Sequence, residues 1–74
     1  MRYYITKHTM VHKGEKTLYP EEGYADRLSE ALEMAQAWVL SGVNRSAFVN
    51  KGKGGPALYH YWADKEGMQY IKYA

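Results

Sequence analysis

One stretch of helical periodicity, between Asp26 and Gly42, constrains the fold of this chain more than any other feature. Its apolar residues recur at spacings of three and four, which places them on one face of an α-helix. Asp26 or Ser29 can cap the start, and Gly42 suits the left-handed position just past the end. We therefore predict a helix over residues 27–41, and its buried face is formed by Leu28, Ala31, Leu32, Ala35, Trp38 and Val39.

The sequence before this helix is typical of β-strands. Residues 2–12 are rich in β-branched and aromatic side chains, which favours a strand, and a turn follows at 12–15. Residues 17–19 form a short return strand that Pro20 stops, because proline cannot donate to a strand ladder. We expect residues 21–23 to be a polar connection to the helix.

The sequence after the helix predicts three more strands, at 46–50, 57–63 and 68–73. A glycine-rich flexible loop separates the first two, and Asp64-Lys65-Glu66-Gly67 suits a type I turn followed by a left-handed residue between the last two. The predicted order is ββαβββ, an α+β fold in which one helix packs on an antiparallel sheet.

The length of 74 residues allows only a single domain, 1–74. Multidomain enzymes, α/β barrels and doubly wound dinucleotide folds are excluded by size. The chain has no cysteine, which removes both a disulfide framework and a thiolate zinc site. We expect no cofactor and no metal.

Charge and hydropathy place few further limits on function. The net charge of +2 is too small to require a nucleic-acid partner. The first residues lack the apolar core of a signal peptide, and no stretch approaches the length of a membrane span. We expect a cytoplasmic protein that does not contact a membrane.

Eight tyrosines are the unusual feature of the composition. If Ala63 faces Met68 across the last hairpin, period-two alternation sorts the hairpin side chains into two sets. The set containing aliphatic residues and Trp62 is predicted to face the helix: Leu58, His60, Trp62, Gln69, Ile71 and Tyr73. The other set is then predicted to lie on the open face of the sheet: Tyr59, Tyr61, Ala63, Met68, Tyr70 and Lys72.

Tyrosines on an open sheet face have two interpretations. They can cover the sheet as amphipathic rings and stabilise it through cross-strand pairs. They can also form a contact surface, because tyrosine is enriched at interface hot spots. A register error of one residue would exchange the two faces.

Catalytic and metal chemistry find little support. No histidine or acid is placed near Ser29, Ser41 or Ser46. His8 and His12 would lie about 13 Å apart on a strand, too far to bind one metal, although His60 could approach either across the sheet. Glu30 and Glu33 share a helix face, as many solvated glutamates do. We therefore expect no enzyme activity.

The loop Lys51-Gly52-Lys53-Gly54-Gly55 superficially resembles a phosphate-binding loop. A P-loop, however, leads into a helix, whereas a proline and a strand follow here. The loop is either a flexible connection or a mobile basic finger. Direct nucleic-acid binding remains an alternative, since bases can stack on tyrosines while lysines meet phosphates.

The layout resembles that of small phage-encoded anti-CRISPR proteins, compact inhibitors of type I CRISPR surveillance complexes. The features it shares with them are Tyr4-Ile5-x-Lys7, Leu28-Ser29-x-Ala31 with Ala35, Lys65-Glu66-Gly67 and Tyr70-Ile71. The segment 13–24 and the glycine-rich loop lie outside the resemblance. The resemblance implies a protein without catalytic activity that docks on a CRISPR complex and obstructs target-DNA binding.

Together these observations lead us to expect a non-enzymatic inhibitor that binds a host protein or nucleoprotein complex and blocks its nucleic-acid binding. The alternatives are a direct nucleic-acid-binding module and a self-associating structural protein, and the chain would be a monomer or a homodimer. The partner-binding residues predicted from the face argument and the basic loops are Tyr59, Tyr61, Tyr70, Lys72, Lys51, Lys53 and Lys65.

Overall fold

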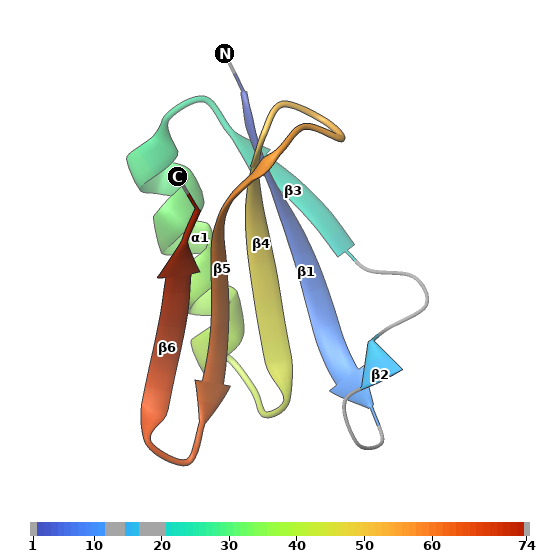
Figure 1. Cartoon of the computed structure of the whole chain (residues 1–74), viewed down its shortest axis with the longest axis vertical. Coiled ribbons are helices and arrows are strands. Elements are labelled where there is room, and N and C mark those ends of the chain that lie inside the picture. The colour runs from blue at the N-terminus through green and yellow to red at the C-terminus, as the bar shows by residue number, and fades with distance from the viewer. Residues whose placement is uncertain (1, 12–14, 17–20, 74) are drawn as a thin grey trace.

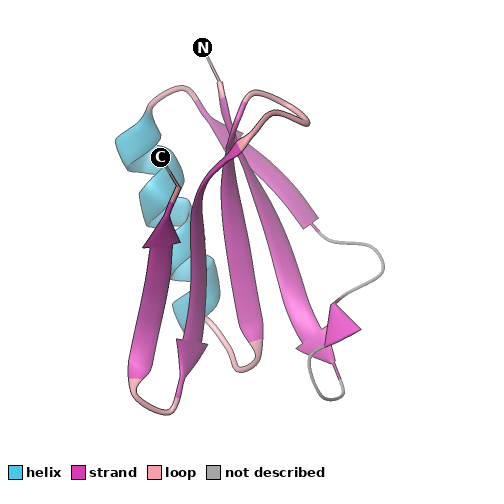
Figure 2. Ribbon diagram, viewed as in Figure 1, coloured by secondary structure: helices cyan, strands magenta, loops and turns pink. Residues whose placement is uncertain are grey.

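A computed structural model of the chain describes residues 2–11, 15–16 and 21–73. Within these residues one helix and six strands form a two-layer α+β fold, which confirms the predicted fold class (Figures 1 and 2). The elements are β1 (Tyr3–Val11), β2 (Glu15–Lys16), β3 (Glu21–Ala25), α1 (Leu28–Leu40), β4 (Arg45–Lys51), β5 (Ala57–Asp64) and β6 (Gly67–Lys72). No helix in the described part of the chain is long and apolar enough to cross a membrane.

The strands form one antiparallel sheet in the order β2-β1-β4-β5-β6. β3 pairs with the other side of β1, so β1, β4 and β5 each have a neighbour on both sides and β6 is an edge strand. The helix α1 packs against one face of this sheet, as Figure 1 shows. The opposite face, which we call the open face, has no helix over it in the described part of the chain.

The strand β3 corrects the prediction that residues 21–23 are a polar connection. Gly23 lies opposite Ile5, and Ala25 lies opposite Tyr3. A Cβ at Gly23 would lie 3.2 Å from Cε of Met34, so the glycine lets this strand pass close to the helix. Charged residues are tolerated here because an edge strand keeps part of its surface in water. The predicted return strand at 17–19 and its stop at Pro20 lie outside the described residues.

The helix begins and ends within one residue of the predicted bounds, but its caps differ from those expected. Arg27 is the N-cap residue and makes no side-chain capping bond, while Asp26 instead pairs with Arg2 at 3.7 Å (Oδ1 to Nε). At the other end, Ser41 donates its hydroxyl to the Trp38 carbonyl at 2.7 Å. The left-handed residue after the helix is Asn44, with φ 57°, and not Gly42.

The core lies between α1 and the central strands. Ile5, Val39 and Val49 are its largest fully buried side chains. The helix contributes Ala31 and Ala35, whose small side chains let it approach the sheet closely. Leu28, Leu32 and Trp38 pack against this core from its edge, so the helix face predicted from the sequence is confirmed.

Candidate interaction surface on the open face

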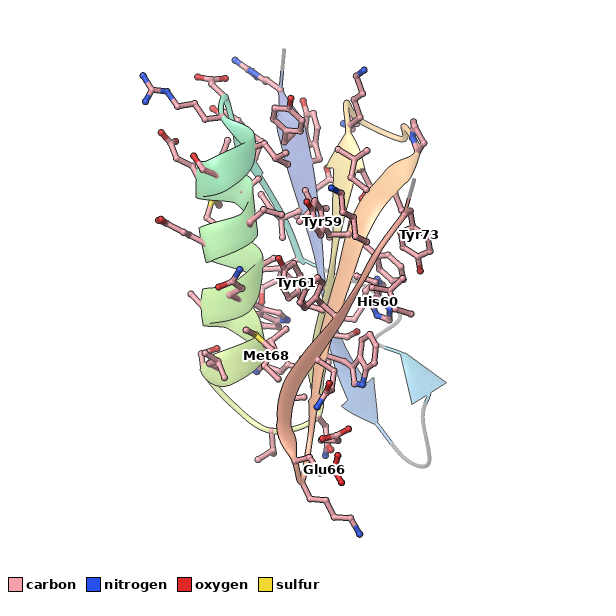
Figure 3. The ribbon with its side chains drawn as sticks, turned by 60° about the vertical axis from the view of Figure 1, so that its left-hand side comes forward. Tyr59, His60, Tyr61, Glu66, Met68 and Tyr73 are labelled. Carbon is pink, nitrogen blue, oxygen red and sulfur yellow. The ribbon has the colours of Figure 1, made fainter. Side chains whose placement is uncertain are left out.

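The β5–β6 hairpin has the predicted register but the opposite choice of faces. Ala63 pairs with Met68, and Gly67 takes the left-handed conformation after the turn, with φ 112°. Tyr61, however, is buried in the core at 3% exposure, and Tyr59 and Met68 pack against it. Figure 3 shows Tyr59, Tyr61 and Met68 directed toward the helix and His60 and Tyr73 directed away from it.

The volume available beneath the helix explains this correction. Tyr61 pairs with Ala47 on β4, and Ala31 and Ala35 belong to the same buried cluster. These alanines leave space that only a large side chain from the sheet can fill. The tyrosine hydroxyl also finds a partner, since Gln36 Nε2 donates to it at 3.2 Å. The predicted faces were wrong because the set with Leu58, Ile71 and Trp62 was assigned to the helix side by its hydrophobicity alone, without regard to the volume beneath the helix.

Tyr70 lies on the helix side of the sheet, yet it remains 61% exposed because the helix packs mainly on β4, β1 and β5 and little on the edge strand β6. Its ring stacks against Tyr61, with centroids 5.6 Å apart. Tyr59, Tyr61 and Tyr70 are therefore neighbours, as predicted, but Tyr61 cannot offer its ring to a partner. The predicted tyrosine platform on the open face is wrong.

A row of four rings crosses the open face instead, and we call it the aromatic row. Phe48 of β4 stacks flat on His60 of β5, with centroids 4.1 Å apart and planes inclined by 3°. His8 of β1 meets the edge of Phe48 at 6.1 Å, and Trp62 of β5 lies 5.2 Å from His60. All four side chains are half-buried, so each still presents part of its ring to the surface.

Apolar side chains of the last strand extend this row toward the sheet edge. Ile71 lies opposite His60 in the β5–β6 register and is 45% exposed. Tyr73 is 39% exposed, and its backbone N–H donates to the Leu58 carbonyl at 2.9 Å. Ile71 and Tyr73 therefore add exposed apolar side chains on the same face as the aromatic row.

The described side chains of β1 and β3–β6 bring little positive charge to the open face. Among the side chains described on β1 and β3–β6, the strand register places Glu22 and Asp64 on this face and no lysine or arginine. Arg2 lies at its end, with Cζ 4.5 Å from the centre of the Tyr24 ring. A side-chain hydrogen bond with Tyr4, followed by the charge interaction with Tyr24, raises the pKa of Arg2, so its positive charge is retained.

The four predicted lysines do not form one cluster. Lys51 ends β4 and Lys53 lies in the loop between β4 and β5, whereas Lys65 lies in the β5–β6 turn at the opposite end of the molecule (Figure 1). Lys72 lies opposite Tyr59, which places it on the helix side of β6. All four side chains are exposed.

The glycine-rich loop is held by its own backbone. Gly55 N–H donates to the Gly52 carbonyl, and Gly52 N–H donates to the Arg2 carbonyl, both at 3.0 Å. Asn50 Nδ2 adds a bond to the Gly55 carbonyl at 3.0 Å. Gly52 and Gly54 have φ values of 78° and 71°, which suit glycine. The loop thus forms a compact turn that projects Lys53 from one end of the sheet.

The histidines do not come together as ligands. His8 and His60 lie on β1 and β5, and Phe48 of the strand between them contacts both rings. The described residues contain no group of three or more histidine, aspartate or glutamate side chains able to hold a metal ion. His12 lies outside the described residues.

Sequence reasoning missed the aromatic row because it considered the last hairpin alone. Phe48 is the only phenylalanine in the chain and lies at an alternating position between the buried Ala47 and Val49. Alternation along the strand directs Phe48 away from the helix, and this orientation, combined with the antiparallel pairing of neighbouring strands, would have indicated His60 as its partner.

Comparisons with protein-family models, curated proteins and solved structures gave no match to this chain.

Proposed function

We propose that this protein is a non-enzymatic binding module that attaches to a protein partner through the open face of its sheet. The observation that supports this proposal is the aromatic row, together with the exposed Ile71 and Tyr73 on the same face. Aromatic rings supply much of the contact area at protein interfaces, and the half-buried packing of these rings lowers the entropy that they lose on binding.

The charge of the open face favours a protein over a nucleic acid as the partner. Binding to phosphates requires lysine or arginine near the stacked bases. Within the described strands β1 and β3–β6, the residues that share the face with the aromatic row include Glu22 and Asp64 but no lysine or arginine. An apolar, nearly neutral surface is better matched to the apolar core of a protein interface.

The resemblance to small anti-CRISPR proteins narrows the proposal to a protein subunit of a type I CRISPR surveillance complex in the host cytoplasm. In this form of the proposal the module binds the subunit and sterically blocks its access to target DNA. Lys51 and Lys53, exposed at one end of the sheet, would then cover the part of the subunit surface that otherwise binds DNA phosphates.

The test is target-DNA binding by a purified type I surveillance complex, titrated with this protein. We expect the wild-type protein to weaken DNA binding, and Ile71→Glu to reduce this effect at least about tenfold, because it places a charge in the apolar contact. Val43→Glu is the matched control. Val43 is 81% exposed but lies in the turn after the helix, so the same change should leave inhibition intact.

Three results would contradict parts of this proposal. Equal inhibition by both variants would mean that the open face is not the contact surface. The absence of any inhibition by folded wild-type protein would exclude the CRISPR complex as the partner. Salt-sensitive DNA or RNA binding by the isolated protein would support a nucleic-acid-binding module instead.

A further inference from the structure

The strand β6 offers an unpaired edge of the sheet. It pairs with β5 along its length, and no strand in the described part of the chain pairs with its other side. Tyr73 N–H donates to the Leu58 carbonyl, and the β5–β6 register is regular from Asp64–Gly67 to Tyr59–Lys72. Because backbone groups alternate in direction along an antiparallel strand, those of Met68, Tyr70 and Lys72 point to the free edge.

This edge lacks most of the features that prevent strands from pairing with other chains. Natural edges are commonly protected by proline, bulges or inward-pointing charges. β6 spans 6 residues, Gly67–Lys72, with no proline, no break in its register and a single charged residue at its end. Tyr70, 61% exposed, adds apolar surface beside the free backbone groups.

We propose that β6 pairs with β6 of a second copy, antiparallel, with Gln69 opposite Gln69. In an antiparallel pair, residues whose backbone groups point to the free edge must lie opposite residues whose groups also point to the free edge. The twofold axis therefore passes between one residue and its own copy, and not between two different residues. The Gln69 register places Met68 opposite Tyr70 of the second copy. It also brings Lys72 to the β5–β6 turn of the second copy, where Glu66 directly precedes β6, and twofold symmetry repeats both contacts.

Charge complementarity selects this register over its nearest competitor. An axis through Tyr70 would place Lys72 opposite Met68 and leave the lysine without an acidic partner. In the Gln69 register each copy contributes one cation and one anion, both exposed in the single chain. Glu66 lies in the turn just before β6 and Lys72 is the last residue of β6, so the two lie at opposite ends of the hairpin's second arm and cannot pair within one copy.

The dimer would leave the open face available. A twofold axis perpendicular to the sheet keeps both helices on the same side, and the two open faces become one continuous surface. This inference does not depend on the proposed function, because the edge residues Met68, Tyr70 and Lys72 belong to the helix side of the sheet.

The first test is the mass of the full chain by sedimentation equilibrium from micromolar to millimolar concentration. We expect the mass to rise from one chain to two. Glu66→Lys and Lys72→Glu, made singly, should each weaken the dimer about tenfold, because the symmetry places each like-charge pair twice. The double variant Glu66→Lys/Lys72→Glu should restore dimerisation, since it exchanges the charges and keeps the pairs.

The second test blocks the edge directly. Lys72→Pro removes an outward-facing N–H without breaking a β5–β6 hydrogen bond, so it should abolish the dimer and leave the chain folded. Lys65→Pro is the matched control, because proline suits the second position of a type I turn and the edge is unchanged.

The outcomes are distinct. A single-chain mass at every concentration would overturn the proposal. It would also be overturned by a dimer that still forms with Lys72→Pro, or whose stability is unchanged by Glu66→Lys and Lys72→Glu. If the chain stays monomeric while Lys72→Pro prevents binding to another protein, the edge takes a partner's strand, and the second copy is excluded. The open-face variant Ile71→Glu tests the proposed function separately.

Discussion

Tyr61 and Tyr70 lie opposite each other on neighbouring strands, yet their exposures are 3% and 61%. Tyr61 lies beneath the helix, where alanines leave room for its ring and Gln36 donates to its hydroxyl. Tyr70 contacts the same group of rings from the exposed edge. The contribution of a tyrosine to stability here depends on its position beneath the helix and not on its strand.

Substitutions at these two residues should separate burial from ring contact. We expect Tyr61→Ala to lower the free energy of unfolding by about 3–5 kcal/mol, because it leaves a cavity in the core. Tyr61→Phe should cost about 1 kcal/mol through the lost bond from Gln36. Tyr70→Ala should cost less than about 1.5 kcal/mol. Urea denaturation measures all three, and a larger loss for Tyr70→Ala than for Tyr61→Ala would contradict this account.

Close backbone packing determines the conformation of the loop between β4 and β5. A Cβ at Gly55 would lie 1.8 Å from the Lys51 carbonyl oxygen, whereas a Cβ at Gly54 would meet nothing within 4 Å. The two glycines therefore serve different purposes. Gly55 permits close approach of two backbone segments, and Gly54 supplies a positive φ of 71°.

Alanine substitutions should distinguish these two purposes. Gly54→Ala should cost about 1 kcal/mol, the usual penalty for a left-handed alanine. Gly55→Ala should cost about 2–3 kcal/mol, because the backbone must move and the bond from Gly55 to Gly52 is lost. The measurement is again the free energy of unfolding, and a Gly55→Ala loss no greater than that of Gly54→Ala would refute the close-approach argument.

Local patterns predicted the elements better than they predicted the faces. The helix and the last hairpin follow from periodicity and turn chemistry, which act within a few residues. The strand β3 was missed because its pairing with β1 depends on contacts distant in sequence and on the space at Gly23. The faces of β5 depended on the volume between sheet and helix, which hydrophobicity alone does not report.

The candidate surface was likewise only partly predictable from the last hairpin. The register that gathers Tyr59, Tyr61 and Tyr70 was correct, but the open face belongs to the alternate set, including His60 and Trp62. Phe48 and His8 complete the aromatic row from β4 and β1, and their contribution required the order of the strands across the sheet. A sheet surface is assembled from several strands, so one hairpin can identify only part of it.

At the scale of the whole molecule, the sheet is protected unevenly. β4 pairs on both sides and lies under the helix, and it contributes the buried Ala47 and Val49. β6 pairs on one side only. Amide hydrogens of β4 should therefore exchange only through global unfolding, whereas those pointing away from β5 at the edge should exchange from the native state.

Hydrogen exchange along β6 should reveal both the alternation and the proposed dimer. At low protein concentration we expect the amides of Gln69 and Ile71 to be protected by β5, while those of Met68 and Tyr70 exchange rapidly. At high concentration the latter pair should become protected as well, because β6 of the second copy accepts their hydrogen bonds. Lys72→Pro should remove this concentration dependence and leave Gln69 and Ile71 protected. Rapid exchange at Tyr70 at every concentration would show that the edge stays open, whereas strong protection in the dilute monomer would mean that the backbone alternation was assigned to the wrong residues.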